Sequence, residues 1–363
     1  MRLEVEAALV AGTFVPGQVE IVDGRIARCG LAGANGRGMA VPGFVDLQVN
    51  GFGGVDFLDA DADGYRRAGE ALVETGVTSF LPTLITAPVD ALLAALAEVP
   101  RNGAVPRVLG VHLEGPFLAA RRLGTHPSLA RRDPDVALLE QLLDGGPVRV
   151  MTLAPELPGA LELIDILRRR GIVVSCGHSD ATAEQANAAF DRGAATVTHL
   201  FNAMRPLSHR DPGIVGAALA RDDVIVQIIA DGVHLAPATM LLVWRAAAGR
   251  VALVTDSVAA ASADGGSYSL GSVELSVRDG AVRAPEGMLA GSVETMIEGV
   301  RNLHALGVPL EAALDAATRV PAAVLSLADA GRLEPGMAAD VVVLDDNLEI
   351  DTVLVGGEAR VVA

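Results

Sequence analysis

Eight short apolar segments alternate with Ala- and Leu-rich segments through most of this chain, and this alternation constrains the fold more than any other feature. The apolar segments are nearly continuous, which is typical of parallel strands that are buried on both faces. Helical segments such as 63–76 and 158–171 separate them, and several end at a glycine. Eight strand-then-helix units predict an α/β fold, a (β/α)8 TIM-type barrel over residues 41–332. The strands are expected at 43–50, 78–84, 107–114, 148–155, 172–178, 195–201, 224–231 and 250–256.

The two terminal segments have a different pattern, made of short strands and turns. Residues 1–40 end in a Gly-rich joint, and residues 333–363 return to strands and turns. Neither segment is large enough to form a core alone, so we predict that both fold together as a small β-sandwich domain beside the barrel. A β-rich insertion at 263–285 is expected to precede a last helix at 292–307.

Composition excludes several functions. All 28 basic residues are arginine, and without lysine there is no Schiff base, no Walker-type phosphate lysine and no carbamate bridge between two metals. The net charge of −17 argues against nucleic acids and anionic membrane surfaces as partners. No run is long and apolar enough to span a membrane. The N-terminus does not resemble a signal peptide, and two widely spaced cysteines favour a cytoplasmic protein.

Polar side chains gather at the carboxyl ends of the expected strands, where barrel enzymes have their active sites. A single His or Glu there is usually structural, but several together indicate a site because buried charges are costly. Glu114, His178 and His199 form a His–His–carboxylate set, which is typical of a catalytic zinc or ferrous site with a position open for water. Asp256 is the candidate general base and acid for metal-activated water. The alternative for Asp256 is a capping residue.

Motifs at these positions resemble the amidohydrolase superfamily and, within it, the family of N-acetylglucosamine-6-phosphate deacetylases. The motifs are PGFVDLQVNG, HLEGPF, GTHP, CGHSDAT, THLFNAM, DGVHL, LVTDS and GRLEPGMAADVVVLD. HLEGPF, THLFNAM and DGVHL are specific to that family, whereas the PGFVD and PGMAAD blocks are shared across the superfamily. The resemblance implies a metal-dependent enzyme, usually a homodimer, that hydrolyses the acetamide of N-acetyl-D-glucosamine 6-phosphate. The products are D-glucosamine 6-phosphate and acetate.

The resemblance also implies a set of substrate contacts. His126 is expected near the sugar, and His234 is expected to polarise the acetyl carbonyl or to bind the sugar. Arg210 is the expected phosphate anchor, in its own or the neighbouring subunit, because a guanidinium matches phosphate in fork geometry. The remaining expected contacts come from two loops and are Asn202, Ala203, Leu289, Ala290 and Gly291.

The first strand departs from the commoner superfamily pattern. Many members have a His-x-His pair there that holds a second metal, but this chain has Gln48 and Asn50. Amides are poor ligands for zinc or iron beside imidazole and carboxylate. We therefore predict one divalent metal per subunit, Zn²⁺ or Fe²⁺, with Gln48 and Asn50 either behind the metal ligands or at a lost second-metal position.

Two alternatives stay open. The same chemistry could act on another N-acetylated sugar phosphate such as N-acetylgalactosamine 6-phosphate, with different hydroxyl contacts around His126 and Asn202. A non-catalytic sugar-phosphate sensor on the same barrel would be marked by lost metal ligands, and in this sequence all three ligands and Asp256 are present.

Overall fold

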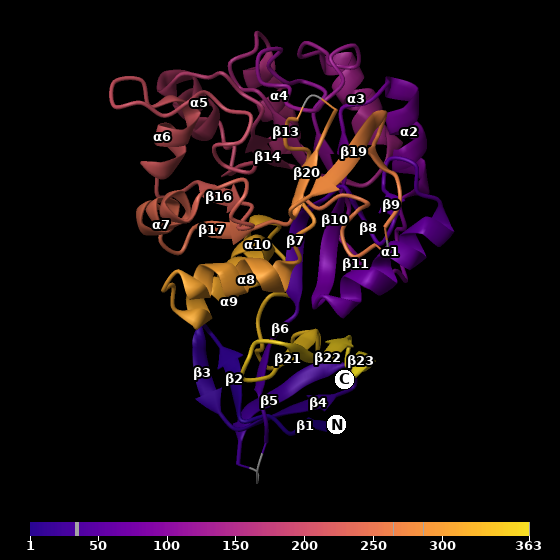
Figure 1. Ribbon diagram of the computed structural model, residues 1–363, viewed down its shortest axis with the longest axis vertical. Coiled ribbons are helices and arrows are strands. Elements are labelled where there is room, and N and C mark those ends of the chain that lie inside the picture. The colour runs from indigo at the N-terminus through magenta and orange to yellow at the C-terminus, as the bar shows by residue number, and fades with distance from the viewer. Residues whose placement is uncertain (33–35, 264, 286, 363) are drawn as a thin grey trace.

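The computed structural model describes residues 1–32, 36–263, 265–285 and 287–362, and most of them form the expected barrel (Figure 1). Eight parallel strands pair in chain order, so the predicted (β/α)8 architecture is confirmed. A two-residue strand, β11 (Arg107–Val108), extends the sheet beside the second barrel strand. The barrel strands are β7 (Phe44–Val49), β10 (Val77–Ile85), β12 (Val111–Glu114), β13 (Val148–Leu153), β14 (Val173–Cys176), β15 (Thr196–Val197), β16 (Ile225–Ile228) and β17 (Val251–Leu253).

The barrel closes between its first and last strands through a few backbone hydrogen bonds. The amide of Asp256 donates to the carbonyl oxygen of Gln48 at 2.9 Å, and the amide of Asn50 donates to the carbonyl oxygen of Ser257 at 2.8 Å. Val49 and Ser257 form an isolated parallel bridge. Closure therefore places Gln48 of β7, and Asn50 directly after β7, beside Asp256, which follows the last strand.

Helices cover the outside of the barrel, and local sequence explains where several of them begin. Asp61 caps the first helix by accepting a hydrogen bond from the amide of Gly64, and Thr182 forms a capping box with Gln185. Across the described ranges, no helix combines the length and apolar character that a membrane crossing requires. The first eight helices are α1 (Ala62–Glu74), α2 (Val89–Glu98), α3 (Val136–Gly145), α4 (Ala160–Arg169), α5 (Ala183–Asp191), α6 (Gly213–Leu219), α7 (Pro237–Ala246) and α8 (Met296–Ala305).

Two short helices follow α8, so the expectation that α8 would be the last helix was wrong. They are α9 (Leu310–Ala317) and α10 (Arg319–Val324). Ala322 of α10 and the adjacent Leu325 pack against Val45 and Leu47 of β7 and other residues of the barrel interior. Their burial on several sides removes the polar face that makes a surface helix recognisable in a sequence.

Strands from both ends of the chain form two further sheets, at the lower end of the molecule in Figure 1. Val19 and Ile26 from one sheet pack with Val341 and Leu354 from the other. The division into domains at residues 40 and 333 stays a prediction. The six-stranded sheet has the order β23 (Glu358–Val362), β22 (Ile350–Val355), β21 (Val341–Leu344), β6 (Met39–Pro42), β2 (Ala7–Val10) and β3 (Thr13–Pro16). The other contains β1 (Arg2–Leu3), β4 (Gln18–Val22) and β5 (Arg25–Leu31).

The expected β-rich insertion is a three-stranded antiparallel sheet of β18 (Tyr268–Leu270), β19 (Val273–Arg278) and β20 (Ala281–Arg283). Leu270 and Val282 pack with Ile85, the last residue of β10. The small β8 (Gly51–Phe52) and β9 (Val55–Asp56) hairpin lies next to it, and the Asp56 carboxylate accepts a hydrogen bond from the amide of Gly271 at 2.7 Å. The insertion is thereby fixed over the end of the barrel at which the strands finish.

Candidate active site

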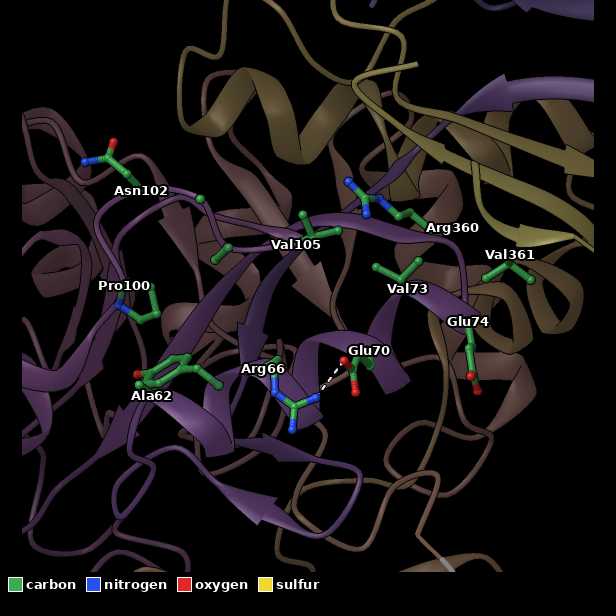
Figure 2. A pocket seen from close by; sticks show the side chains of 13 residues that line it. Ala62, Arg66, Glu70, Val73, Glu74, Pro100, Asn102, Val105, Arg360 and Val361 are labelled. Atoms are coloured by element: carbon green, nitrogen blue, oxygen red, sulfur yellow. Dashed lines mark hydrogen bonds and ion pairs between the residues drawn. The ribbon is translucent and has the colours of Figure 1, made fainter. Parts of the chain in front are cut away.

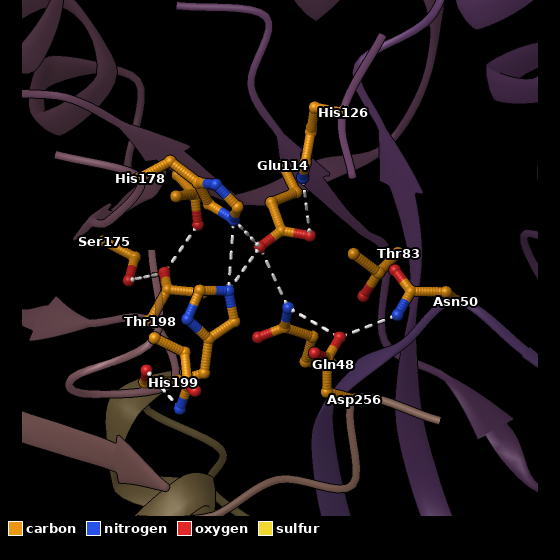
Figure 3. Close-up of polar contacts among 12 residues, drawn as sticks. Gln48, Asn50, Thr83, Glu114, His126, Ser175, His178, Thr198, His199 and Asp256 are labelled. Carbon is orange, nitrogen blue, oxygen red and sulfur yellow. Dashed lines mark hydrogen bonds and ion pairs between the residues drawn. The ribbon is translucent and has the colours of Figure 1, made fainter. Parts of the chain in front are cut away.

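The three expected metal ligands meet at the carboxyl ends of neighbouring strands (Figure 3). Glu114 is the last residue of β12, and His178 and His199 each lie two residues beyond their strands. Nε2 of His178 and Nε2 of His199 are 3.1 Å and 3.0 Å from Oε1 of Glu114, and 3.1 Å from each other. Both histidines have a positive φ, of 47° and 29°, a strained conformation that is common at functional sites.

The arrangement fits a divalent metal. Nδ1 of His178 lies 2.9 Å from the carbonyl oxygen of Arg122, which can only accept, so Nδ1 carries the proton and Nε2 turns a lone pair toward Glu114. Glu114 is 3% exposed, and His178 and His199 are nearly as buried. Burial acts to raise the pKa of Glu114, but its contacts with His126, His178 and His199 hold that pKa well below its ordinary value. Two imidazole nitrogens and one carboxylate oxygen that converge in this way are a typical catalytic zinc or iron donor set.

Two amide side chains connect Asp256 to this group. Nε2 of Gln48 donates to Oε1 of Glu114 at 3.1 Å and to Oδ1 of Asp256 at 3.0 Å, and Nδ2 of Asn50 donates to the same Oδ1 at 2.7 Å. No described side chain donates to Oδ2 of Asp256, which leaves that oxygen for a reacting proton. Burial, and then the nearby negative charge of Glu114, raise the pKa of Asp256 to about 6.

A cavity of about 340 Å³ opens over these residues and collects most of the expected substrate contacts. Arg210 is exposed and is not among the residues that line this chain's cavity. Ala290 is buried behind the lining, and Gln48 is fully buried beneath it. The roles of these residues stay predictions. Of the expected site residues, those that line the cavity are Asn50, Glu114, His126, His178, His199, Asn202, Ala203, His234, Asp256, Leu289 and Gly291.

His126 lies beside the three candidate metal ligands, and its hydrogen bonds fix the orientation of its ring. Its Nδ1 accepts a hydrogen bond from the amide of Thr86 at 3.3 Å, so the proton of the neutral ring is on Nε2, 3.6 Å from Oε2 of Glu114. Burial, together with the charge of His178, lowers the pKa of His126 to about 4. His126 is therefore neutral at physiological pH and presents an N–H group to the cavity.

Sequence reasoning missed two arginines at the cavity rim. Arg121 and Arg122 both line the cavity, and only Leu123 separates them from the GTHP motif. Arg122 has a structural role, because its guanidinium group donates two hydrogen bonds to Oδ1 of Asp180, at 2.8 Å and 2.6 Å. Arg121 is 84% exposed and lies 3.8 Å from the same carboxylate. The Arg-Arg pair beside a recognised motif was the available signal.

A larger cavity, of about 640 Å³, lies elsewhere, between α1, the segment 100–105 and β23 (Figure 2). Arg66, which lines it, is paired with Glu70 at 2.7 Å. Among the described residues, none of the expected metal, catalytic or substrate-binding residues lines this cavity. The smaller cavity is therefore the candidate active site.

Comparisons with known proteins agree with this assignment. A model of the amidohydrolase family matches residues 39–360. The chain is 41% identical over 336 residues to N-acetylglucosamine-6-phosphate deacetylase of Homo sapiens, a match that covers 87% of this chain and 82% of the relative. It is 38% identical over 325 residues to N-acetylgalactosamine-6-phosphate deacetylase of Escherichia coli O157:H7, covering 87% and 86%. A solved Mycobacterium smegmatis structure, a mutant N-acetyl-D-glucosamine-6-phosphate deacetylase in complex with N-acetyl-D-glucosamine-6-phosphate, is 36% identical, with a TM-score of 0.94 and 99% of both chains covered.

Proposed function

We propose that this chain, which belongs to the amidohydrolase family, hydrolyses the acetamide of N-acetyl-D-glucosamine 6-phosphate to D-glucosamine 6-phosphate and acetate. The observation that carries the proposal is the buried group of Glu114, His178 and His199, which shares one cavity with Asp256. The chain's similarity to deacetylases of phosphorylated amino sugars supports the substrate.

Glu114, His178 and His199 would hold one divalent metal per subunit, Zn²⁺ or Fe²⁺. When bound, the metal supplies Lewis acidity, which polarises a carbonyl group and lowers the pKa of water. Gln48 and Asn50 turn their amide nitrogens toward Asp256, and this orientation supports a single metal because the N–H groups cannot coordinate a second cation.

Asp256 acts as the general base and then as the general acid. Oδ2 takes a proton from the water that attacks the acetyl carbon, and the same carboxyl group returns it to the amine nitrogen as the C–N bond breaks. Gln48 and Asn50 hold Oδ1 and thereby aim Oδ2. His234 stabilises the negative charge that develops on the acetyl oxygen.

His126, Asn202 and Ala203 bind the sugar, and the segment 289–291 closes the pocket. Arg210 binds the phosphate group, and its exposure outside this chain's cavity supports a role in the neighbouring subunit of a homodimer. Both cysteines are free, which supports a reducing, cytoplasmic location.

Acetate release from the purified, metal-loaded protein tests the proposal. We expect release from N-acetyl-D-glucosamine 6-phosphate and much less from unphosphorylated N-acetyl-D-glucosamine. The Asp256→Asn variant should keep its metal and lose most turnover, and a wild-type rate in that variant would contradict the assigned base. Absence of release from the phosphorylated sugar by metal-loaded protein would overturn the proposed substrate.

N-acetyl-D-galactosamine 6-phosphate is the second candidate substrate, because one relative of similar identity carries that activity in its name. The two sugars differ only in the configuration of one hydroxyl group. The ratio of their kcat/KM values, measured with the same enzyme preparation, decides between them.

A further inference from the structure

Asp231 and His234 form a closely held pair in the turn after β16. Nδ1 of His234 lies 2.7 Å from Oδ2 of Asp231, and the side chains of His234 and Asp231 are only 5% and 10% exposed. The other oxygen, Oδ1, accepts hydrogen bonds from the backbone amides of Val233 and His234, both at 2.8 Å. Three hydrogen bonds therefore fix the carboxylate, and the turn holds it against the imidazole.

This pairing decides how the His234 ring carries its proton. Burial acts to raise the pKa of Asp231, but the contacts with His234 hold it below its ordinary value, so Asp231 is a carboxylate at neutral pH. A carboxylate accepts hydrogen bonds and does not donate them. The neutral ring therefore keeps its proton on Nδ1, and Nε2 is the ring nitrogen that Asp231 leaves free, on a residue that lines the cavity.

Among the carboxyl groups near this pair, Asp231 is the one that acts as counter-ion to the His234 ring. Glu294, before α8, is 7% exposed, and burial together with the charge of Asp231 raises its pKa well above the ordinary value, which favours its uncharged form. Nδ2 of Asn302 donates to Oε1 of Glu294 at 2.9 Å and holds it in place. Asp256, on the cavity side, is a further carboxyl group within electrostatic range of His234.

We propose that Asp231 is a positioning residue for His234 and fixes the Nδ1–H form of its ring. In that form Nε2 carries a lone pair, so Nε2 donates to the acetyl oxygen only when the ring carries a second proton. The inference rests on the proposed function for the role of the donor. The Asp231 carboxylate then lies directly against the imidazolium charge, as an oriented partner does in other acid–base sites.

The Asp231→Asn variant reverses the proton pattern without removing the turn. Oδ1 of the new amide still accepts from the two backbone amides, while its nitrogen donates to Nδ1 and moves the ring proton to Nε2. We expect kcat to fall by roughly 10- to 100-fold with little change in KM, because a neutral donor replaces a charged one.

A double-mutant cycle separates this role from a structural one. In a His234→Gln background, Asp231→Asn should have no further effect on kcat. An equal loss in both backgrounds would show that Asp231 acts on the turn, and an unchanged kcat in the single variant would also overturn the proposal. Glu294→Gln is the matched control, expected to leave kcat unchanged because burial already favours the uncharged form of Glu294.

Nuclear magnetic resonance of ¹⁵N-histidine-labelled, metal-loaded protein tests the proton pattern independently of activity. The His234 signals are identified by their loss in His234→Gln. We expect the proton of the neutral ring on Nδ1 in the wild type and on Nε2 in Asp231→Asn, and the same position in both proteins would overturn the inference. If the wild type releases no acetate, the proposed function fails while this test of the ring still stands.

Discussion

Removal of the shortest hydrogen bond to the candidate base should move the acid side of the pH–rate profile. In Asn50→Leu, Oδ1 of Asp256 loses a donor at 2.7 Å in a site where Asn50 is 2% exposed. A hydrogen bond to a charged group is worth about 1.5–3 kcal/mol, which corresponds to a roughly 10- to 100-fold weaker acid and therefore to a higher pKa of Asp256. The direction follows because the bond stabilises only the carboxylate form, and burial already raises this pKa to about 6.

The assay is kcat/KM for acetate release between pH 4.5 and pH 9 with metal-loaded enzyme. Below the pKa of the base, the ionised fraction of Asp256 falls in proportion to its acid dissociation constant, so the rate at low pH should fall by roughly 10- to 100-fold and recover at alkaline pH. Val49→Ala is the control, because Val49 directly precedes Asn50 as the last residue of β7 and packs in the hydrophobic core. An acid limb in Asn50→Leu that coincides with the wild-type limb would refute the reasoning.

Three further predictions concern the metal, the pH dependence of stability and the pocket wall. His199→Ala should lose most of its bound metal in elemental analysis after dialysis, with helix content unchanged, since one of the three ligands is gone. Asp46 is fully buried, and burial raises its pKa to about 7. Between pH 4 and pH 7 the folded protein therefore binds more protons than the unfolded protein. The free energy of unfolding of the protein falls as pH rises through this range. Relative to Asp46→Asn in urea titrations, the wild type should lose up to about 4 kcal/mol across that range, and parallel curves would contradict this. Gly291→Ala should unfold at least about 1 kcal/mol more easily and lose activity, because Gly291 has a φ of 71° and a Cβ there would lie 2.6 Å from the carbonyl oxygen of Asp256. A free energy of unfolding equal to the wild-type value would contradict that steric argument.

The barrel could be predicted because its strands are buried on both faces, but the ends of those strands could not. Residues 195–201 were expected to form one strand, whereas β15 contains only Thr196–Val197. The chain leaves the ladder because His199 and Phe201 both adopt a positive φ, which turns them out of the strand direction. An apolar segment indicates that its residues are buried. It does not indicate where the backbone turns at the end of a strand to form a site.

The candidate metal ligands were predictable because a Glu and two His residues at strand ends are costly to bury without a function. The partners of Asp256 were not, because Gln48 and Asn50 contact it only through closure of the barrel between strands that are distant in sequence. The Asp231–His234 pair depends on local turn geometry. Arg121 was missed because a surface arginine pair is common and its place at the cavity rim depends on how the preceding loop folds.

The pairing of β6 with β21 has a consequence for how the polypeptide folds as it leaves the ribosome. Met39–Pro42 is synthesised before the barrel and Val341–Leu344 after it, yet the two strands are hydrogen-bonded neighbours. Until the later strand emerges, the edge of β6 that it covers has no partner, and an open edge of this kind favours association with other nascent chains. Such a long-range contact forms slowly. Completion of this sheet is therefore expected to be a late event, after the barrel has assembled.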